Sequence, residues 1–313
     1  MRRIALLCAL AALSALAFLT LGVPKGALEF ALKFRAEKLV GLILVAFAIA
    51  ASTQLFHTAT RNRILTPAIM GFDALYLMIQ TSLVYGLGAI ATLSIPIIPK
   101  FFFEVVAMMS FSTGLFLWLF TTRGRDLHLL ILVGIIFGTL FRSLSGFVAR
   151  MIDPNEFVVV QSSMFASFNT IDSSLLGIGV FLCAICVPVL WIMRHQFDIL
   201  ALGRETAINL GLHYRRVMFI SFALIGLLVS VSTALVGPVT FFGLLVTHLA
   251  YLILPGARFA PTMFASLLIA IITLVGGQAI YEHVLNLKGT LSVVIELAGG
   301  LVFLFLLLRG VKK

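Results

Sequence analysis

Four charged side chains interrupt the long apolar stretches of this 313-residue sequence: Asp73, Glu104, Arg142 and Glu296. A charge near the centre of a bilayer costs at least about 2.5–3.5 kcal/mol on insertion scales, so each should face protein or water. Arg142 could pair with a neighbouring acid, and Glu296 could form a hydrogen bond between helices. Asp73 or Glu296 could instead hold a coupling ion at the midplane, as an ion-coupled secondary transporter of a small solute would require.

The other reactive side chains do not form a catalytic or metal-binding set. Cys183-x-x-Cys186 has a redox-like spacing, but no second Cys or His pair accompanies it, and such cysteines act as small hydrophobes. His57 and His248 stand alone, which favours packing over metal ligation. The sequence has no Gly-x-x-x-x-Gly-Lys-Ser/Thr loop, so ATP hydrolysis would need a separate subunit. We therefore expect no enzyme activity, no metal site and no cofactor.

The elements that must position these residues are membrane spans. Hydrophobic residues make up 61% of the chain and the mean hydropathy is +1.17, whereas a soluble domain has about 45–50% apolar residues. A span needs about 20 mainly apolar residues. We predict an all-α polytopic membrane protein with one transmembrane domain over 1–313, whose spans run over about 4–22, 39–57, 67–88, 101–120, 127–148, 173–194, 216–236, 238–254, 262–281 and 291–308.

Basic residues in the predicted connections set the orientation. With the N-terminus in the cytoplasm, fourteen of the 22 Lys and Arg fall inside, and an even number of spans returns the C-terminus to that side. The net charge of +10 then reflects cytoplasmic loops rather than nucleic-acid binding. Residues 4–21 precede no Ala-x-Ala cleavage site, which predicts a retained first span. At Gly237-Pro238 two spans meet with almost no loop, and a single bent helix there would invert everything that follows.

One polar segment, 198–216, separates two apolar spans and is competent to form a helix, which we predict over about 198–212 with Gly211 as its cap. A membrane bundle has no structural need for an Arg-rich connection of this length, so we expect a partner to dock on it. On the opposite side, the connection 150–172 has enough apolar residues for a short interfacial helix. Gly134-x-x-x-Gly138 would let two helices approach closely.

Three stretches together resemble the permease subunits of type II ABC importers, the FecCD-type family that takes up ferric siderophores, haem and cobalamin. The first comprises Arg35, Gln54 and the loop 61–71 (RNRILTPAIMG), in which Arg63 replaces the usual Pro. The second, 203–211 (GRETAINLG), is similar to the cytoplasmic coupling segment that seats in a groove of the ATPase.

The third stretch, 237–251 (GPVTFFGLLVTHLAY), looks like the family's Gly-Pro-Ile-x-Phe-x-Gly-Leu-x-x-Pro-His segment. Thr247 replaces the usual Pro, which predicts a straighter helix than in relatives. The resemblance covers essentially the whole chain. The segments 61–63 and 288–292 look most like the branch for catecholate-type iron chelates, in which the permease is one half of a heterodimer.

The resemblance implies the type II permease fold and the ATP-driven import of an iron(III)-siderophore complex, with haem or cobalamin left open as cargo. The chain would lie in the inner (plasma) membrane with both termini in the cytoplasm. Its implied partners are a second permease chain, two ABC ATPase subunits, a periplasmic or lipoprotein siderophore-binding protein and membrane lipid. A heterodimer of permeases is favoured over a homodimer. Iron would travel wrapped in its chelator, which removes the need for protein ligands.

The match also implies roles for individual residues. ATPase coupling would involve Gly203, Arg204, Glu205, Ala207, Leu210 and Gly211, with the small or apolar ones entering the groove. Docking of the binding protein would involve Arg35, Lys38 and Lys288. The pathway or its gate would involve Thr121, Thr122, Arg142, Ser143 and Glu296. The plainer alternatives are a solvated loop, basic anchors at the membrane interface and contacts between helices.

Overall fold

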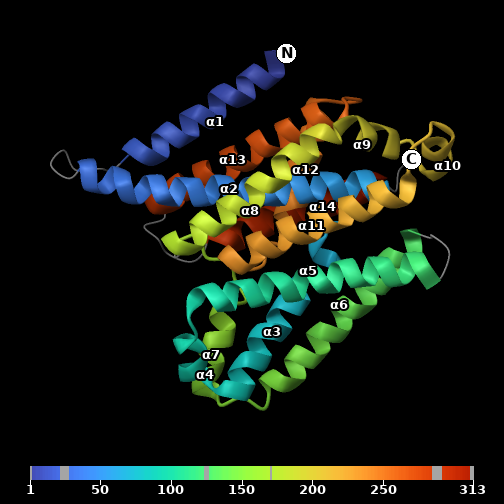
Figure 1. Ribbon diagram of the computed structural model, residues 1–313. Coiled ribbons are helices and arrows are strands. Elements are labelled where there is room, and N and C mark those ends of the chain that lie inside the picture. Colours follow the sequence, from blue (N-terminus) through green and yellow to red (C-terminus); the bar gives the residue numbers. More distant parts are fainter. Residues whose placement is uncertain (1, 22–27, 123–126, 170, 284–290, 311–313) are drawn as a thin grey trace.

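The computed structural model describes residues 2–21, 28–122, 127–169, 171–283 and 291–310, which contain helices and no strand (Figure 1). Each of the ten predicted spans corresponds to one helix: α1 (Arg2–Thr20), α2 (Leu28–Thr60), α3 (Phe72–Leu87), α5 (Ile97–Thr122), α6 (Leu127–Ala149), α8 (Ser173–Ile192), α11 (Tyr214–Val236), α12 (Phe242–Ile253), α13 (Phe259–His283) and α14 (Leu291–Gly310). Seven of them, α1, α2, α5, α6, α8, α11 and α13, contain stretches long and apolar enough to cross a membrane, and α12 and α14 contain shorter apolar helices. The all-α prediction is confirmed.

Five shorter elements connect these helices: η1 (Ala68–Met70), α4 (Ala89–Ser94), α7 (Pro154–Ser162), α9 (Arg194–Leu200) and α10 (Arg204–Asn209). Helix α7 is the short helix expected between 150 and 172. It begins where its sequence allows, because Asp153 caps it by accepting a hydrogen bond from the Asn155 backbone N–H at 2.8 Å. Pro154 occupies the first turn, where its missing N–H does no harm.

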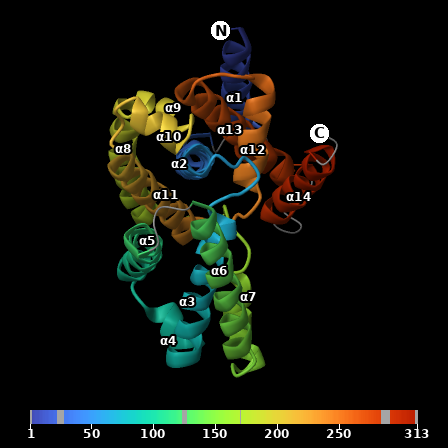
Figure 2. The ribbon, with the colours of Figure 1, turned by 90° about the vertical axis from the view of Figure 1, so that its right-hand side faces the viewer.

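Helix α2 lies at the centre of the bundle (Figure 2). From Leu44 to Thr60 every residue except Phe47 is buried, as expected for a helix without a solvent-facing stripe. Helices α8, α11, α12 and α13 pack around it. The second half of α2 therefore places polar side chains, among them Gln54 and His57, inside the protein.

A second group of helices, α3 to α7, lies beside this bundle and is joined to it chiefly through α5, which packs on α11 (Figure 1). Within the group, α3 packs on α6. The turn before α3 approaches α6 so closely that a Cβ on Gly71, which has a φ of 101°, would lie 3.0 Å from the Cα of Gly138. A Cβ on Gly134 would lie 2.9 Å from the Met70 Cε atom. The close approach predicted from Gly134 and Gly138 is confirmed, with the η1 turn as its partner.

The chain reverses direction after Val236, so α11 and α12 are two helices rather than one bent helix. Gly237 adopts a φ of 98° and ends α11. Helix α12 then runs alongside α2: Gly243 lies against Thr53, and Tyr251 stacks on His57, which is one turn further along α2. The prediction of two separate spans at Gly237-Pro238 is therefore retained, and the spans that follow are not inverted.

Candidate functional site

The polar segment 198–216 lies at one end of the bundle, named the insert end here, which is on the right in Figure 1. It forms two short helices, so the prediction of one helix over 198–212 is wrong. Helix α9 follows α8 directly, and residues 201–203 turn before α10 begins. The reason is Gly203, whose φ of 102° is incompatible with a continuous right-handed helix.

Parts of the three stretches that carry the family resemblance, namely the loop 61–71, Gly203 and Tyr251, meet at the insert end. A Cβ on Gly203 would lie 2.7 Å from Arg61 Nη1, so the insert packs against the loop 61–71. The same loop reaches the third stretch, because the guanidinium of Arg63 lies 4.3 Å from the ring centre of Tyr251. Sequence order alone could not show that these motifs form one surface.

Helix α10 ends at Asn209, and Gly211 caps it, as predicted. Gly211 has a φ of 82°, the Leu212 N–H donates to the Ala207 carbonyl at 2.9 Å, and the Gly211 N–H donates to the Ile208 carbonyl at 2.9 Å. This pair of bonds is the Schellman motif, which satisfies the last carbonyls of a helix and favours glycine.

Ala207 does not belong to the exposed surface of the insert. Its side chain is 0% exposed and packs in the core cluster that contains Phe197, Leu200 and Tyr214. The expectation that Ala207 enters a groove on a partner is therefore corrected: its small size lets α10 sit on α9 and α11. A residue buried in its own chain cannot contact a second protein unless α10 first detaches.

The exposed surface of the insert combines apolar and charged groups. Arg204, Glu205 and Gly211 are exposed, as expected, and Leu210 is 58% exposed. Two further apolar side chains, Leu202 at 55% and Ile208 at 46%, were not singled out from the sequence. Exposed leucine and isoleucine on a polar protrusion form the kind of surface that proteins use for contact with a partner.

At the opposite end, Arg35 and Lys38 make contacts within the chain. Arg35 Nη1 donates to the backbone carbonyls of Phe18 at 2.9 Å and Leu21 at 2.6 Å, at the end of α1. Lys38 pairs with Glu282 on α13, and both side chains are mostly buried. This ion pair holds α2 to α13, and the docking role of Lys38 stays a prediction. Lys288, the third expected docking residue, lies outside the described residues.

Replacement of Lys38 by alanine is expected to destabilise the permease by about 2–3 kcal/mol, because it leaves the Glu282 carboxylate without its cation. The midpoint of thermal unfolding in detergent measures this loss. Lys33→Ala, at an exposed position of α2, is the matched control and should leave the midpoint unchanged. Unchanged stability of Lys38→Ala, together with weaker association of a binding protein, would instead support the docking role.

Three of the four charged residues expected inside the membrane gather near the start of α3. Asp73 Oδ2 accepts a hydrogen bond from Thr240 Oγ1 at 2.8 Å, and it lies within electrostatic reach of Glu296 and Arg142. Arg142 is exposed on α6 and Glu296 is half-buried on α14. The fourth, Glu104, lies elsewhere and is buried, accepting a hydrogen bond from Gln80 Nε2 at 2.6 Å.

The remaining candidates are the pathway residues, a histidine and two cysteines. Of the pathway residues, Ser143 is exposed beside Arg142, whereas Thr121 and Thr122 end α5 and their side chains lie outside the described part of the chain. His57 packs on Tyr251, and Cys183 and Cys186 are buried free thiols. Among the described residues, no group of three or more His, Cys, Asp or Glu side chains could hold a metal ion.

The whole chain, rather than one motif, matches a known family. The sequence model of the FecCD transport family covers residues 4–309. The chain belongs to the FecCD transport family. Its insert, its loop 61–71 and its segment 237–251 are therefore parts of a FecCD permease, which is a transport subunit in the membrane.

Individual relatives of this FecCD chain include two proteins from bacilli. It is 44% identical to the petrobactin import system permease protein YclO of Bacillus subtilis (strain 168), over 91% of this chain and 90% of the relative. It is 35% identical to the petrobactin import system permease protein FatC of Bacillus anthracis, over 88% of this chain and 78% of the relative.

The FecCD chain also shares its fold with a solved structure described as an inward-facing metal-chelate type ABC transporter. The TM-score is 0.81 at 20% identity, over 98% of this chain and 99% of the other. This likeness confirms the polytopic permease fold that the sequence predicted.

Proposed function

We propose that this FecCD chain is the permease subunit of an ATP-driven importer that carries an iron(III)-siderophore complex into the cytoplasm. The observation that carries the proposal is the 44% identity to a petrobactin permease over 91% of the chain. The 35% identity to a second petrobactin permease supports the same function. The iron(III) complex of petrobactin is therefore the first cargo to test.

The permease would act as one half of a heterodimer. Bacillus anthracis has FatC and FatD, and Bacillus subtilis has YclO and YclN, all named as petrobactin import system permease proteins. This chain is 44% identical to YclO but 23% identical to YclN, so it would take the position of YclO beside a second, different chain. Two ATPase subunits and a siderophore-binding protein would complete the importer.

The insert end would face the cytoplasm and receive the ATPase. Its described basic residues outnumber its acids, Asp198 and Glu205, and they comprise Arg2, Arg3, Arg61, Arg63, Arg194, Arg204, Arg215, Arg216 and Arg258. Such an excess is typical of cytoplasmic loops. ATP hydrolysis on the partner would move α10, and the packing of Ala207 on α9 and α11 would pass that movement to the bundle.

The test is uptake of radiolabelled iron-petrobactin by cells that express this permease with its partner subunits. We expect uptake to stop when ATP is depleted and to continue when ion gradients are collapsed with ATP present. Full uptake after ATP depletion, with an ion gradient intact, would instead support a secondary transporter. Equal competition by unrelated siderophores would contradict the choice of petrobactin but not the import mechanism.

A further inference from the structure

The turn from α11 to α12, residues 237–241, lies inside the protein rather than on its surface. Gly237, Pro238 and Val239 are buried, and Gly237 has a φ of 98°. A Cβ on Gly237 would lie 3.2 Å from the Ala166 Cα atom. Non-helical backbone in a membrane protein is tolerated where protein encloses it or where it lines a cavity. The neighbours of this turn therefore decide its role.

Thr240 connects two helices on different sides of the turn. Its Oγ1 atom donates a hydrogen bond to Asp73 Oδ2 at 2.8 Å, near the start of α3. Its backbone N–H faces the carboxylate of Glu296 on α14. A Cβ on Gly299, also on α14, would lie 2.9 Å from the Phe241 Cβ atom, so α14 packs directly on the turn. Because α3 and α14 share no extensive packing within the described residues, the turn at Thr240 links them.

Asp73, the acceptor of the Thr240 hydrogen bond, brings a carboxylate into the predicted span 67–88. Its bonded partner is a neutral hydroxyl, and within the described part of the chain it forms no ion pair. Arg142 on α6 and Glu296 on α14 lie within electrostatic reach of it. Ionisable side chains inside membrane proteins are rare because burial of a charge there is costly, and they usually mark functional sites. A contact made through Asp73 is therefore a candidate for a role in transport.

Helix α11 connects the insert to this turn. It begins at Tyr214, directly after the insert and in contact with α10, and it ends at Val236, directly before the turn. Packed helices transmit displacement as rigid elements. A displacement of the insert at the start of α11 would therefore reach Thr240 at its far end.

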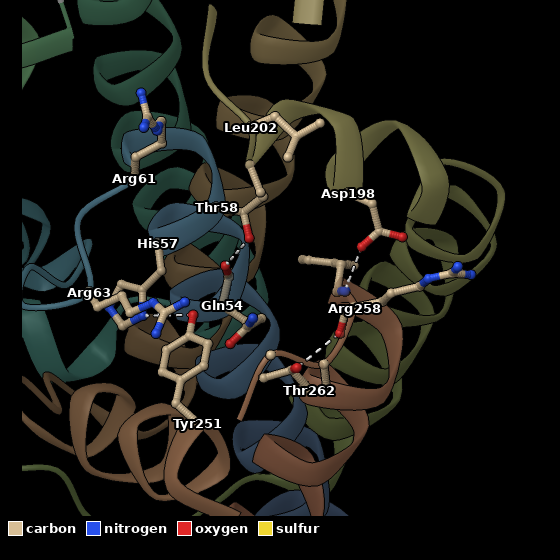
Figure 3. Close-up of a pocket in the computed structure, with 14 residues that line it drawn as sticks. Gln54, His57, Thr58, Arg61, Arg63, Asp198, Leu202, Tyr251, Arg258 and Thr262 are labelled. Carbon is tan, nitrogen blue, oxygen red and sulfur yellow. Dashed lines mark hydrogen bonds between the residues drawn. The ribbon is translucent and has the colours of Figure 1, made fainter. Parts of the chain in front are cut away.

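The loop 61–71 also reaches Thr240 from the insert end. Near its start, the guanidinium of Arg63 lies over the ring of Tyr251 and fixes the loop to α12 (Figure 3). Further along the loop, Thr66 Oγ1 donates a hydrogen bond to the Thr240 carbonyl at 3.4 Å. Both α11 and this loop, which lead away from the insert end, therefore converge on Thr240.

We propose that Thr240 is a positioning residue for transport, which passes movement of the insert to the helices that carry the predicted pathway residues. Its side chain acts on α3, which packs on α6 with Arg142, and its backbone acts on α14 with Glu296. The inference rests on the proposed import function, since it gives the turn a part in that mechanism. The alternative is a hydrogen bond that only stabilises the fold.

The test uses the complete importer, with its partner subunits and binding protein, reconstituted in liposomes. Iron-petrobactin uptake and ATP hydrolysis are measured on the same vesicles. Thr240→Val removes the hydroxyl at nearly constant volume. Loss of one hydrogen bond to a charged group should lower the iron imported per ATP about tenfold, with the ATPase subunits still bound. Thr240→Ser keeps the hydroxyl and should restore the wild-type ratio.

Further variants show whether the effect comes from this contact. Asp73→Leu removes the acceptor, and the double variant with Thr240→Val should be no worse than either single variant, because both changes break the same bond. Thr273→Val on α13 is the matched control. The Thr273 hydroxyl donates only to the Ile269 carbonyl of its own helix at 2.8 Å, so this variant should transport as the wild type does.

A distance measurement tests the movement itself. Spin labels at Ser82 on α3 and Leu301 on α14, both exposed, are placed in a chain whose three cysteines are changed to alanine. In the complete importer we expect the distance between the labels to change when ATP binds. Thr240→Val should lose that change while its thermal unfolding midpoint stays near that of the wild type.

Three results would overturn the assignment: a normal ratio of uptake to ATP hydrolysis in Thr240→Val, equal losses in Thr240→Val and Thr240→Ser, or a label distance that ATP does not change in the wild-type background. Any of these would leave the hydrogen bond as a structural contact. Absence of iron-petrobactin uptake by the wild type would instead contradict the proposed function, and the label distances would still decide whether Thr240 links α3 to α14.

Discussion

Replacing Ile208 and Leu210 together by aspartate is expected to abolish ATP-driven uptake while leaving the permease folded. The two side chains are 46% and 58% exposed, so the substitution removes nothing from the core of the chain. Exposed changes of this kind shift stability by no more than about 0.5 kcal/mol. If both side chains enter an apolar groove on the ATPase, each anchor contributes about 2 kcal/mol or more, and affinity should fall at least about hundredfold.

Two measurements check this prediction: co-purification of the ATPase subunits with the permease, and the rate of iron uptake. Asn209→Asp is the matched control, because it adds a negative charge to the same exposed helix without removing apolar surface. The control should retain most of the association. Normal association and uptake by the double variant would place the docking surface elsewhere on the permease.

The fold was largely predictable because each span is specified by a local pattern in the sequence. An apolar run of about 20 residues specifies a helix in a membrane whatever surrounds it. Each predicted span therefore corresponds to a helix, with ends displaced by several residues. The largest displacement is in α2, which starts at Leu28 rather than near 39, because charged residues before the apolar run can still be helical.

Contacts between distant residues were not predictable in this way. Arg35 and Lys38 both precede an apolar span, and that pattern fits an exposed docking residue as well as an internal one. Only the positions of Phe18 and Glu282, which belong to other helices, show that both side chains are engaged within the chain. The gathering of Asp73, Arg142 and Glu296 depends likewise on the packing of α3, α6 and α14.

The insert illustrates the same limit at shorter range. Its polarity and its Gly211 cap were evident in the sequence, and Gly211 caps α10 as expected. Gly203 was assigned to coupling, but it also breaks the helix and makes room for Arg61, which lies far away in the sequence. In a helix of only six residues, α10, the apolar pattern is too short to show which side chains face inward.

Replacing Ala207 by arginine is expected to destabilise the permease itself by about 4 kcal/mol or more, rather than simply to block docking. The Ala207 side chain is 0% exposed, between α9 and α11, so an arginine there would bury an unpaired charge and overfill the packing. Thermal unfolding in detergent and the amount of folded permease in membranes both measure the loss. ATPase association should disappear as a consequence, because the folded insert is no longer present.

Ala201→Arg separates the two explanations for that loss. Ala201 lies on the same insert but is exposed, so an arginine there can extend into water and should leave the unfolding midpoint unchanged. If Ala207→Arg were as stable as Ala201→Arg and lost only its ATPase, α10 would have to detach readily from α9 and α11. Ala207 would then be a docking residue after all. If only Ala207→Arg unfolds, Ala207 is a buried packing contact between α10 and its neighbours α9 and α11. Movement of the insert would reach α11 through that contact.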